Sequence, residues 1–278
     1  MSDINSKIKQ DERHWQDLRG GSLQQRAYER RGTQVMMQGQ FARVAEELRL
    51  RPGIRLLDLG CGAGLFLGWL AGQMETKCYG LDLSLNSLQS AREATKTIHL
   101  TLGDAELLPY KDSSFDRISC NGAAHHLLDL PSALREIHRV LEPGGILVMY
   151  EPNANLLTNA VRRLFLSDDK YESPADLAHK DEFTPATVKA TLHETGFTNI
   201  QTALCDFLAY PLSGMYMDLP LSRSRMAMKL LTGLESGLER LSFLKPLFDV
   251  FAWRVLVVAT KAPGSAPHMR RSNLSCPA

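Results

Sequence analysis

Three closely spaced glycines mark the first place where this sequence could do chemistry. In the stretch LLDLGCGAGLFLGWL, Gly60, Gly62 and Gly64 follow the apolar run Ile54–Leu59 and precede a second apolar run, Leu65–Leu70. The first run has the length of a buried parallel strand, and the second suits a helix. A glycine-rich turn between a strand and a helix leaves backbone N–H groups and the positive end of a helix dipole open to a ligand. The turn is therefore a candidate site for a nucleotide-like ligand.

Two acids follow at the ends of the next two predicted strands. Asp82, in CYGLDLS, stands where a carboxylate can accept hydrogen bonds from both hydroxyls of a ribose. Asp104, in GDAELLP, stands where it can accept a hydrogen bond from an exocyclic adenine amine. The residue that would be the third glycine of a dinucleotide fingerprint is Leu65, and no Gly-Lys-Ser/Thr follows as in a phosphate loop. The pattern predicts an adenosine site without a pyrophosphate.

Simpler explanations exist for each of these residues. The glycines can form a tight turn without a ligand, and Asp82 can serve as an acid at a helix N-terminus. Cys61, between the first two glycines, is interpreted as a small packing residue whose backbone faces the ligand.

The elements that must position these residues alternate between strand and helix patterns. Between the strands lie helical segments such as LNSLQSAREA and PSALREIHRVL, and this rhythm is typical of a parallel α/β sheet. The predicted strands are Ile54–Leu59, Lys77–Leu83, Ile98–Leu102, Phe115–Cys120 and Gly145–Tyr150.

Helices are predicted on both sides of this region, and two strands close the chain. Residues 22–50 form one or two amphipathic helices, and a helix from Pro185 to about Thr195 begins after the N-cap Thr184 and ends before Gly196. NIQTALC and WRVLVVATK are two late strands, which about 45 residues separate.

Four ordered motifs resemble those of a known family. DLGCGAG, GLDLS, GDAELLPYKDSSFD and LREIHRVLEPGG are similar to motifs of the class I S-adenosylmethionine-dependent methyltransferases, and most similar to the small-molecule branch with the ubiquinone and menaquinone biosynthesis methyltransferases. The likeness covers residues 40–155 well and residues 184–261 by pattern only. It implies an α/β, Rossmann-like fold: a seven-stranded, mostly parallel sheet with an antiparallel last strand, helices on both faces and a helical cap.

The resemblance implies S-adenosylmethionine as cofactor. Its cationic sulfonium and ammonium groups favour nearby acids. The residues implied to bind it are Gly60, Cys61 and Gly62 at the methionine moiety, Asp82 and Leu83 at the ribose, Asp104 and Ala105 at the adenine, Asn121 at its border, and Asp58 beside the loop or the amino group.

Candidate catalytic residues follow the fourth and fifth strands. CNGAAHHLLDL contains the adjacent residues His125 and His126, of which at most one is expected to face the methyl group, and Glu151 follows the fifth strand in MYEPN. Since the resemblance places the end of the fourth strand beside that methyl group and imidazole titrates near neutral pH, we choose His126 as the base and keep Glu151 as a second candidate. Alternatively, the histidines pack or cap the turn and Glu151 fixes a loop.

Composition excludes several other classes. A formal net charge of +1 and the lack of a Lys/Arg block speak against a nucleic-acid substrate. The five cysteines are widely spaced without a Cys-x-x-Cys or Cys/His cluster, which favours reduced thiols and no metal site. The polar first twenty residues do not form a signal peptide, and no apolar run reaches the ~18 residues of a membrane span, so we expect a cytoplasmic protein.

The expected organisation is an N-terminal helical cap (1–50), a methyltransferase domain (51–261) and a disordered tail (262–278). Insertions at 155–182 and 210–251 extend the cap. In the second insertion Met226, Leu230 and Leu234 fall at helical spacing. They either pack the cap on the sheet or form an apolar pocket or a patch for peripheral membrane contact. Tyr28 and Trp15 either close over the cofactor or belong to the core.

The expected activity is transfer of a methyl group to a small, apolar acceptor, at oxygen or carbon, by in-line displacement. Quinone precursors, polyketides and lipid-like molecules are the acceptor classes left open. The alternative is a catalytically silent protein of the same fold that acts as a nucleoside-binding or scaffold module.

Overall fold

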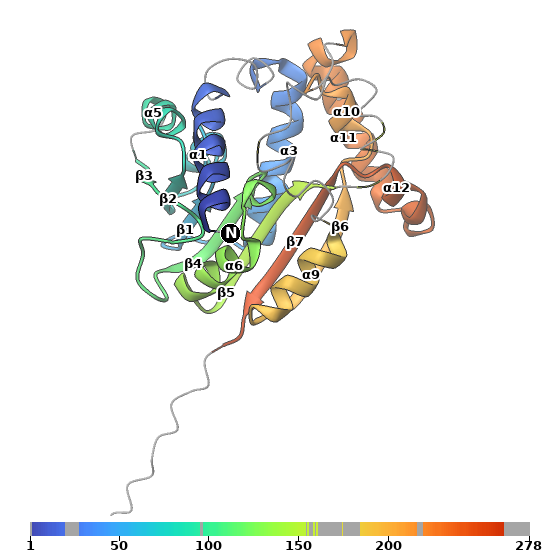
Figure 1. Cartoon of the computed structure of the whole chain (residues 1–278). Coiled ribbons are helices and arrows are strands. Elements are labelled where there is room, and N and C mark those ends of the chain that lie inside the picture. Colours follow the sequence, from blue (N-terminus) through green and yellow to red (C-terminus); the bar gives the residue numbers. More distant parts are fainter. Residues whose placement is uncertain are drawn as a thin grey trace, which may run out of the picture.

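Seven strands form one sheet in the order β3-β2-β1-β4-β5-β7-β6 (Figure 1). The computed structural model describes residues 2–19, 28–94, 97–153, 155, 158, 160, 174, 184–215 and 219–263. The strands are β1 (Arg55–Leu59), β2 (Lys77–Asp82), β3 (His99–Leu102), β4 (Phe115–Asn121), β5 (Leu141–Pro152), β6 (Phe197–Cys205) and β7 (Arg254–Lys261). β1 to β5 pair in parallel, whereas β7 pairs antiparallel with both β5 and β6. The predicted mostly parallel sheet with an antiparallel last strand is confirmed.

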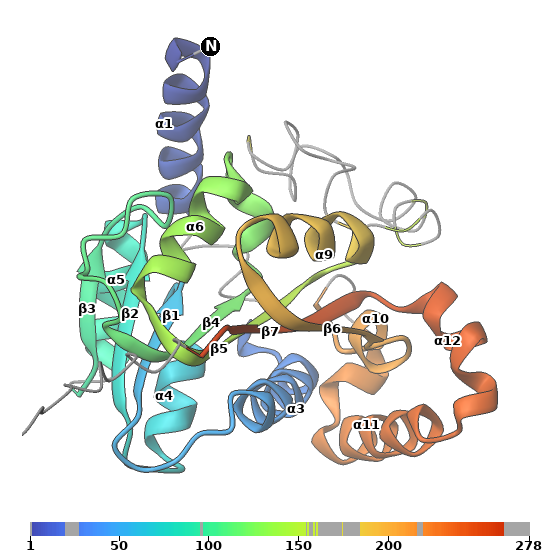
Figure 2. The same ribbon diagram turned by 90° about the horizontal axis from the view of Figure 1, so that it is seen from below.

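Helices cover both faces of this sheet (Figure 2). The α-helices are α1 (Ser2–Arg19), α3 (Arg31–Glu47), α4 (Leu65–Ala71), α5 (Leu85–Ala94), α6 (Leu130–Val140), α9 (Pro185–Glu194), α10 (Ala209–Leu212), α11 (Arg225–Glu239) and α12 (Lys245–Phe251). Short 3-10 helices are η1 (Ala124–His126), η3 (Pro220–Arg223) and η4 (Ser242–Leu244).

The alternation of side chains along each strand divides the core in two. Leu57 and Leu59 of β1 belong to the cluster that includes residues of α6 and α9, whereas Leu56 belongs to the cluster with residues of α3, α4 and α5. Successive side chains of a strand point to opposite faces, so both faces of the central strands are buried. This explains the continuous apolar runs by which the strands are recognisable in the sequence.

Most predicted elements agree with the structure. The helix α5 has the predicted bounds, and α9 begins with a capping box at Thr184 and is followed by Gly196 at a φ of 93°. β5 is longer than its prediction, Gly145–Tyr150, because Leu141 pairs with Phe115 before a register shift and Pro152 pairs with β7 after it. The long segment before β7 does contain helices, α10 to α12.

The α11 helix is anchored to α3 by polar contacts. Arg43 of α3 forms an ion pair of 2.7 Å with Glu239 of α11. Gln40, also on α3, donates a hydrogen bond to Asp206, which lies directly after β6. These contacts connect Asp206 and α11 to the helix that borders the site described below. Of the predicted insertion 155–182 and tail 262–278, nearly all residues lie outside the described part of the chain.

Candidate functional site

The carboxyl ends of three parallel strands lie level with one another. Leu59 of β1 is in register with Leu81 of β2 on one side and Cys120 of β4 on the other. The next residue of each strand is therefore Gly60, Asp82 or Asn121 at one common edge. In open parallel sheets, ligands bind at this edge, where the strand order reverses. The register explains how acids and glycines far apart in the sequence come together.

The glycine turn after β1 is fixed by backbone hydrogen bonds to β2. The amide groups of Gly60 and Cys61 donate to the carbonyl oxygen of Leu81 at 2.8 and 3.1 Å, and the amide of Gly62 donates to Asp82 Oδ2 at 2.7 Å. Gly60 and Gly62 have φ values of 64° and 53°, a backbone region that residues other than glycine rarely adopt.

The two glycines differ in their surroundings. A Cβ atom on Gly60 would lie 2.3 Å from Cβ of Ala123, whereas a Cβ atom on Gly62 would have no neighbour within 4 Å. The missing side chain of Gly60 therefore permits close packing against Ala123 in the loop after β4. The missing side chain of Gly62 instead leaves space beside its backbone.

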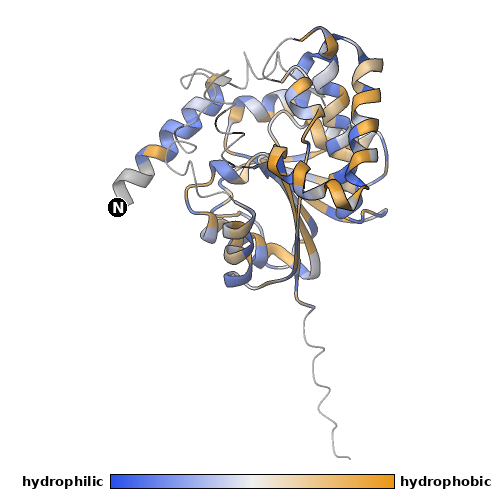
Figure 3. Cartoon of the chain, turned by 90° about the vertical axis from the view of Figure 1, so that its right-hand side faces the viewer, coloured by the Kyte–Doolittle hydropathy of each residue, from blue (hydrophilic) through white to orange (hydrophobic). Residues whose placement is uncertain are grey.

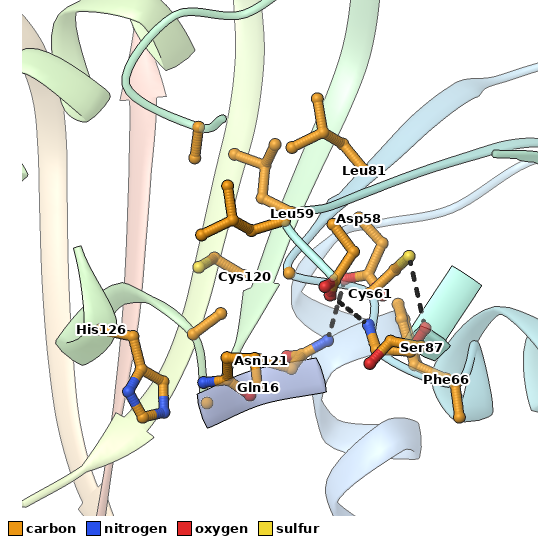
Figure 4. Close-up of a pocket in the computed structure, with 18 of the residues that line it drawn as sticks. Gln16, Asp58, Leu59, Cys61, Phe66, Leu81, Ser87, Cys120, Asn121 and His126 are labelled. Carbon is orange, nitrogen blue, oxygen red and sulfur yellow. Dashed lines mark hydrogen bonds between the residues drawn. The ribbon is translucent and has the colours of Figure 1, made fainter. Parts of the chain in front are cut away.

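A cavity of about 430 Å³ lies at this edge of the sheet. All nine residues predicted to bind the cofactor line it, and so does His126 (Figure 4). They are Asp58, Gly60, Cys61, Gly62, Asp82, Leu83, Asp104, Ala105 and Asn121. Figure 4 shows Asp58, Cys61 and Ser87 gathered at one side of the cavity and His126 at the other. Cys61 is 7% exposed, and its sulfur lies against β2, beside Gly80, as expected of a packing residue.

The cavity is strongly acidic. Among its described lining residues, Lys9 is the one lysine or arginine. The six carboxylates that line it are Glu12, Glu29, Asp58, Asp82, Asp104 and Glu106. Such a charge balance favours a cationic ligand and opposes a pyrophosphate.

Asp58 is deeply buried, with 3% of its surface exposed. Burial, together with the charge of Asp82, raises the pKa of Asp58 to about 7, although Ser119 donates to its Oδ1 at 2.6 Å. Burial also raises the pKa of Asp82, against the lowering effect of hydrogen bonds from the amides of Ser84 and Gly62. Both carboxylates are thus held where a nearby cation would stabilise their ionised forms.

The α1 helix supplies lining residues that the sequence did not indicate, namely Lys9, Glu12 and Gln16. The ammonium of Lys9 lies 2.5 Å from Asp104 Oδ2 and 2.6 Å from Glu106 Oε2. Ninety-five residues of sequence separate Lys9 from Asp104, so no local pattern could have revealed this pairing.

Two aromatic residues were interpreted either as closing over the cofactor or as part of the core, and the structure separates them. Tyr28 lines the cavity. Trp15 does not line it, but its ring centroid lies 6.1 Å from that of His126. Trp15 therefore lies next to the candidate base without lining the cavity.

The histidine pair and Glu151 have different positions. Glu151 is completely buried and is not among the cavity-lining residues; its Oε1 accepts from the amides of Ala123 and Ala124, and its Oε2 lies 2.7 Å from His125 Nδ1. Burial raises its pKa, but the hydrogen bond and charge of His125, with smaller effects of the Ala124 amide and the Arg254 charge, lower it overall. These contacts fix the loop after β4, while His126 faces the cavity with its Nδ1 3.4 Å from Glu12 Oε1.

The side chains of Met226, Leu230 and Leu234 do not line this cavity. They are exposed on α11. Their interpretation as an acceptor pocket is not supported by their position.

A family model described as a methyltransferase domain matches residues 57–149. This range begins within β1 and ends within β5, and it contains all the candidate cofactor-binding residues. The match therefore covers the strand ends that form the cavity.

Curated relatives align over the same region. The malonyl-[acyl-carrier protein] O-methyltransferase of Erwinia pyrifoliae is 44% identical over 104 residues, 37% of this chain and 39% of the relative. The demethylmenaquinone methyltransferase of Staphylococcus haemolyticus is 35% identical over 113 residues, 39% of this chain and 47% of the relative. The arginine hydroxylase NDUFAF5 of Homo sapiens is 35% identical over 92 residues, 33% of this chain and 27% of the relative. The chain thus spans less than half the length of these three proteins.

A solved structure shares the fold over most of the chain. The phosphoethanolamine N-methyltransferase 2 of Haemonchus contortus, in complex with S-adenosyl-L-methionine, superimposes with a TM-score of 0.54 and 19% sequence identity. The match covers 81% of this chain and 52% of that one. It agrees with a Rossmann-like methyltransferase fold.

The contrast between the two glycines generates a stability prediction. We expect Gly62→Ala to lower the free energy of unfolding by about 1 kcal/mol, because only its positive φ is unfavourable for alanine. Gly60→Ala should lower the free energy of unfolding by about 2 to 4 kcal/mol, because its Cβ would also clash with Cβ of Ala123. Urea denaturation of both variants measures the difference; equal losses would show that the approach of Ala123 does not constrain the turn.

The raised pKa of Asp58 generates a second prediction. Between pH 4 and about 7 the folded protein holds a proton on Asp58 that the unfolded chain, with a carboxyl pKa of 3.8, has released. This contribution makes the free energy of unfolding fall as the pH rises through that window. Asp58→Asn should remove this contribution, so that its free energy of unfolding falls less steeply with pH than that of the wild type. Urea denaturation across this pH range measures both dependences. Parallel profiles would refute the raised pKa.

Proposed function

We propose that this chain, which carries the domain of the class I S-adenosylmethionine-dependent methyltransferases, transfers a methyl group from S-adenosylmethionine to a small, apolar acceptor. The observation that carries the proposal is the acidic cavity, in which three strand ends and the open backbone of Gly62 converge. The aligned segments cover less than half of each relative, so the acceptors of those enzymes are not assigned to this chain.

The residues of the cavity fit this cofactor. The space beside Gly62 can receive a ligand, and the buried Oδ1 of Asn121 has no hydrogen-bond partner among the described residues, so it can accept from an ammonium group. Each oxygen of Asp82 accepts one backbone hydrogen bond and retains lone pairs for ribose hydroxyls. Asp104 can similarly accept from an adenine amine, beside its ion pair with Lys9.

When bound, the cofactor supplies an electrophilic methyl group on a cationic sulfur and leaves as a neutral thioether. The protein therefore needs no acid for the leaving group. Its contribution is to hold donor and acceptor in line, which accounts for most of the rate enhancement expected here. The sheet edge formed by β1 to β4 is suited to this task, because each proposed binding residue lies within three residues of a strand end. The α1 helix adds Lys9, Glu12 and Gln16 to the wall of the cavity.

A base is needed if the acceptor attacks through a hydroxyl group. We assign this role to His126, which lines the cavity, and propose that Glu12 orients it. A neutral imidazole that directs its Nδ1–H toward a carboxylate carries its basic lone pair on Nε2. Glu151, our second candidate, is proposed to act through the loop that it fixes, since both its oxygens are engaged.

The acceptor is proposed to be apolar because α3 and α4 line the cavity with hydrophobic side chains. Met37 and Phe41 come from α3, and Leu65 and Phe66 come from α4. Quinone precursors, polyketides and lipid-like molecules all offer apolar groups that such a wall can bury.

A different reaction on the same domain is the second candidate, because one relative is an arginine hydroxylase. A catalytically silent nucleoside-binding module is a third outcome. These alternatives share the cavity with the proposed methyltransferase, so only an assay of methyl transfer separates them.

The proposal is tested first by cofactor binding. Calorimetry should detect S-adenosylmethionine and no binding of a nicotinamide dinucleotide. Asp82→Ala should weaken S-adenosylmethionine binding by about 1 to 2 kcal/mol, because a carboxylate that accepts ribose hydroxyl groups is lost. Transfer of a labelled methyl group to a panel of quinone-precursor, phenolic and lipid acceptors then tests the reaction. Binding without transfer to any acceptor would favour the silent module, and unchanged affinity of folded Asp82→Ala would refute the ribose assignment.

The role of His126 gives a prediction about pH. We expect His126→Ala to lower kcat by ~100-fold with a hydroxyl acceptor, and to leave the affinity for S-adenosylmethionine unchanged. The wild-type kcat should fall at acidic pH because a protonated imidazole cannot act as a base, and this dependence should vanish in the variant. His125→Ala serves as the control. It removes the contact of His125 with Glu151 in the loop after β4, yet its kcat should still fall at acidic pH as in the wild type. A His126→Ala variant with the wild-type pH profile would exclude His126 as the base.

A further inference from the structure

Large hydrophobic side chains are exposed along one short part of the chain. Of the 14 that are exposed among the described residues, eight lie between residues 226 and 251. They are Met226, Leu230, Leu234, Leu241, Phe243, Leu247, Val250 and Phe251, which we call the α11–α12 face. Isolated exposed hydrophobic residues are common, but such a concentration indicates an interaction surface. In Figure 3, which views the molecule from this side, hydrophobic and hydrophilic residues alternate along the helices.

The orientation of α11 is fixed by contacts on its opposite side. Glu235 is buried, and its carboxylate accepts hydrogen bonds from the amides of Leu208 and Ala209 at 2.6 and 3.2 Å. The ion pair of Glu239 with Arg43 holds the same side toward α3. Met226 and Leu230 are 74% and 70% exposed as a consequence. Their exposure therefore follows from an anchored helix.

The charges beside the apolar stripe have one sign. With 3.6 residues per turn, Arg225, Lys229 and Arg240 fall along one flank of the stripe, and all three are exposed. The two acids of α11, Glu235 and Glu239, face the protein. Apolar side chains bordered by cations on the outer side of a helix are typical of helices that lie in a membrane interface. The cations match the negative surface of an anionic leaflet.

We propose that the α11–α12 face docks on the surface of an anionic lipid bilayer, with its hydrophobic side chains in the headgroup boundary and its cations at the lipid headgroups. No helix in the described residues is long and apolar enough to span a membrane. A second copy of this chain is a poorer occupant, because a symmetric pairing would bring like charges together. The charge and the apolar stripe thus favour one partner, the lipid surface.

The docking goes beyond the proposed methyl transfer and requires neither cofactor nor acceptor. Its position nevertheless has a consequence for the cavity. The α11 helix packs against α3, and α3 supplies Met37 and Phe41 to the cavity wall. After docking, only α11 would separate α3, which forms this wall, from the lipid. An apolar acceptor dissolved in the lipid would then have a short path to the cavity.

Vesicle cosedimentation of the full chain tests the docking. We expect the protein to pellet with vesicles of phosphatidylcholine containing about 30% phosphatidylglycerol, and at least about tenfold less with pure phosphatidylcholine. Leu230→Glu combined with Leu234→Glu should weaken binding at least about tenfold. Lys229→Glu combined with Arg240→Glu should weaken binding to the anionic vesicles selectively. Leu107→Glu is the matched control, because Leu107 is 77% exposed and follows β3, at the opposite edge of the sheet from β6.

Thermal unfolding establishes that each variant is folded, and sedimentation velocity reports its oligomeric state. Absence of wild-type binding to anionic vesicles would overturn the proposal, as would equal binding by the Leu230→Glu/Leu234→Glu variant. A wild-type dimer that this double substitution dissociates would assign the face to a second copy and would also overturn it. Retained vesicle binding by a variant that lacks methyl transfer would leave the docking proposal intact.

Discussion

The hydrogen bond from the Gly62 amide to the Asp82 carboxylate connects the turn after β1 to the end of β2. It has this effect because the parallel register already places the two strand ends level. Two further bonds, from Gly60 and Cys61 to Leu81, hold the same turn. The open backbone at Gly62, the carboxylate proposed to bind a ribose and the approach of the next loop at Gly60 all depend on this junction. A change of register by one residue would separate them.

Electrostatics then determine which ligands this junction can hold. The described residues that line the cavity include six carboxylates and one lysine, and burial raises the pKa of Asp58 to about 7. A cation beside Asp58 would favour its ionised form and relieve part of the cost of burying acids close together. The same arrangement opposes phosphate groups. The charge of the cavity therefore agrees with a sulfonium and ammonium ligand independently of any family resemblance.

Much of the fold could be predicted because its evidence is local. Buried parallel strands need unbroken apolar runs, and amphipathic helices need apolar residues at helical spacing, so β1 to β4, α5 and α9 were recognisable. The bounds of β5 could not be predicted, because the two ends of this strand depend on pairing with Phe115 and with β7. Strand partners of this kind lie far away in the sequence, and residues 141–144 carry no local strand pattern.

The sequence by itself determined the strand-end site, since Gly62, Asp82 and Asp104 each lie within three residues of the end of a predictable strand. The tertiary structure alone decided which other residues join them. It brought Lys9 to Asp104, faced His126 to the cavity and buried Glu151 under the preceding loop. It also decided that Leu230 lies outside, because helical periodicity groups residues on one face without saying which face is covered. The physical reason is the same in each case: packing between segments distant in sequence, not local pattern, decides which side chains are covered.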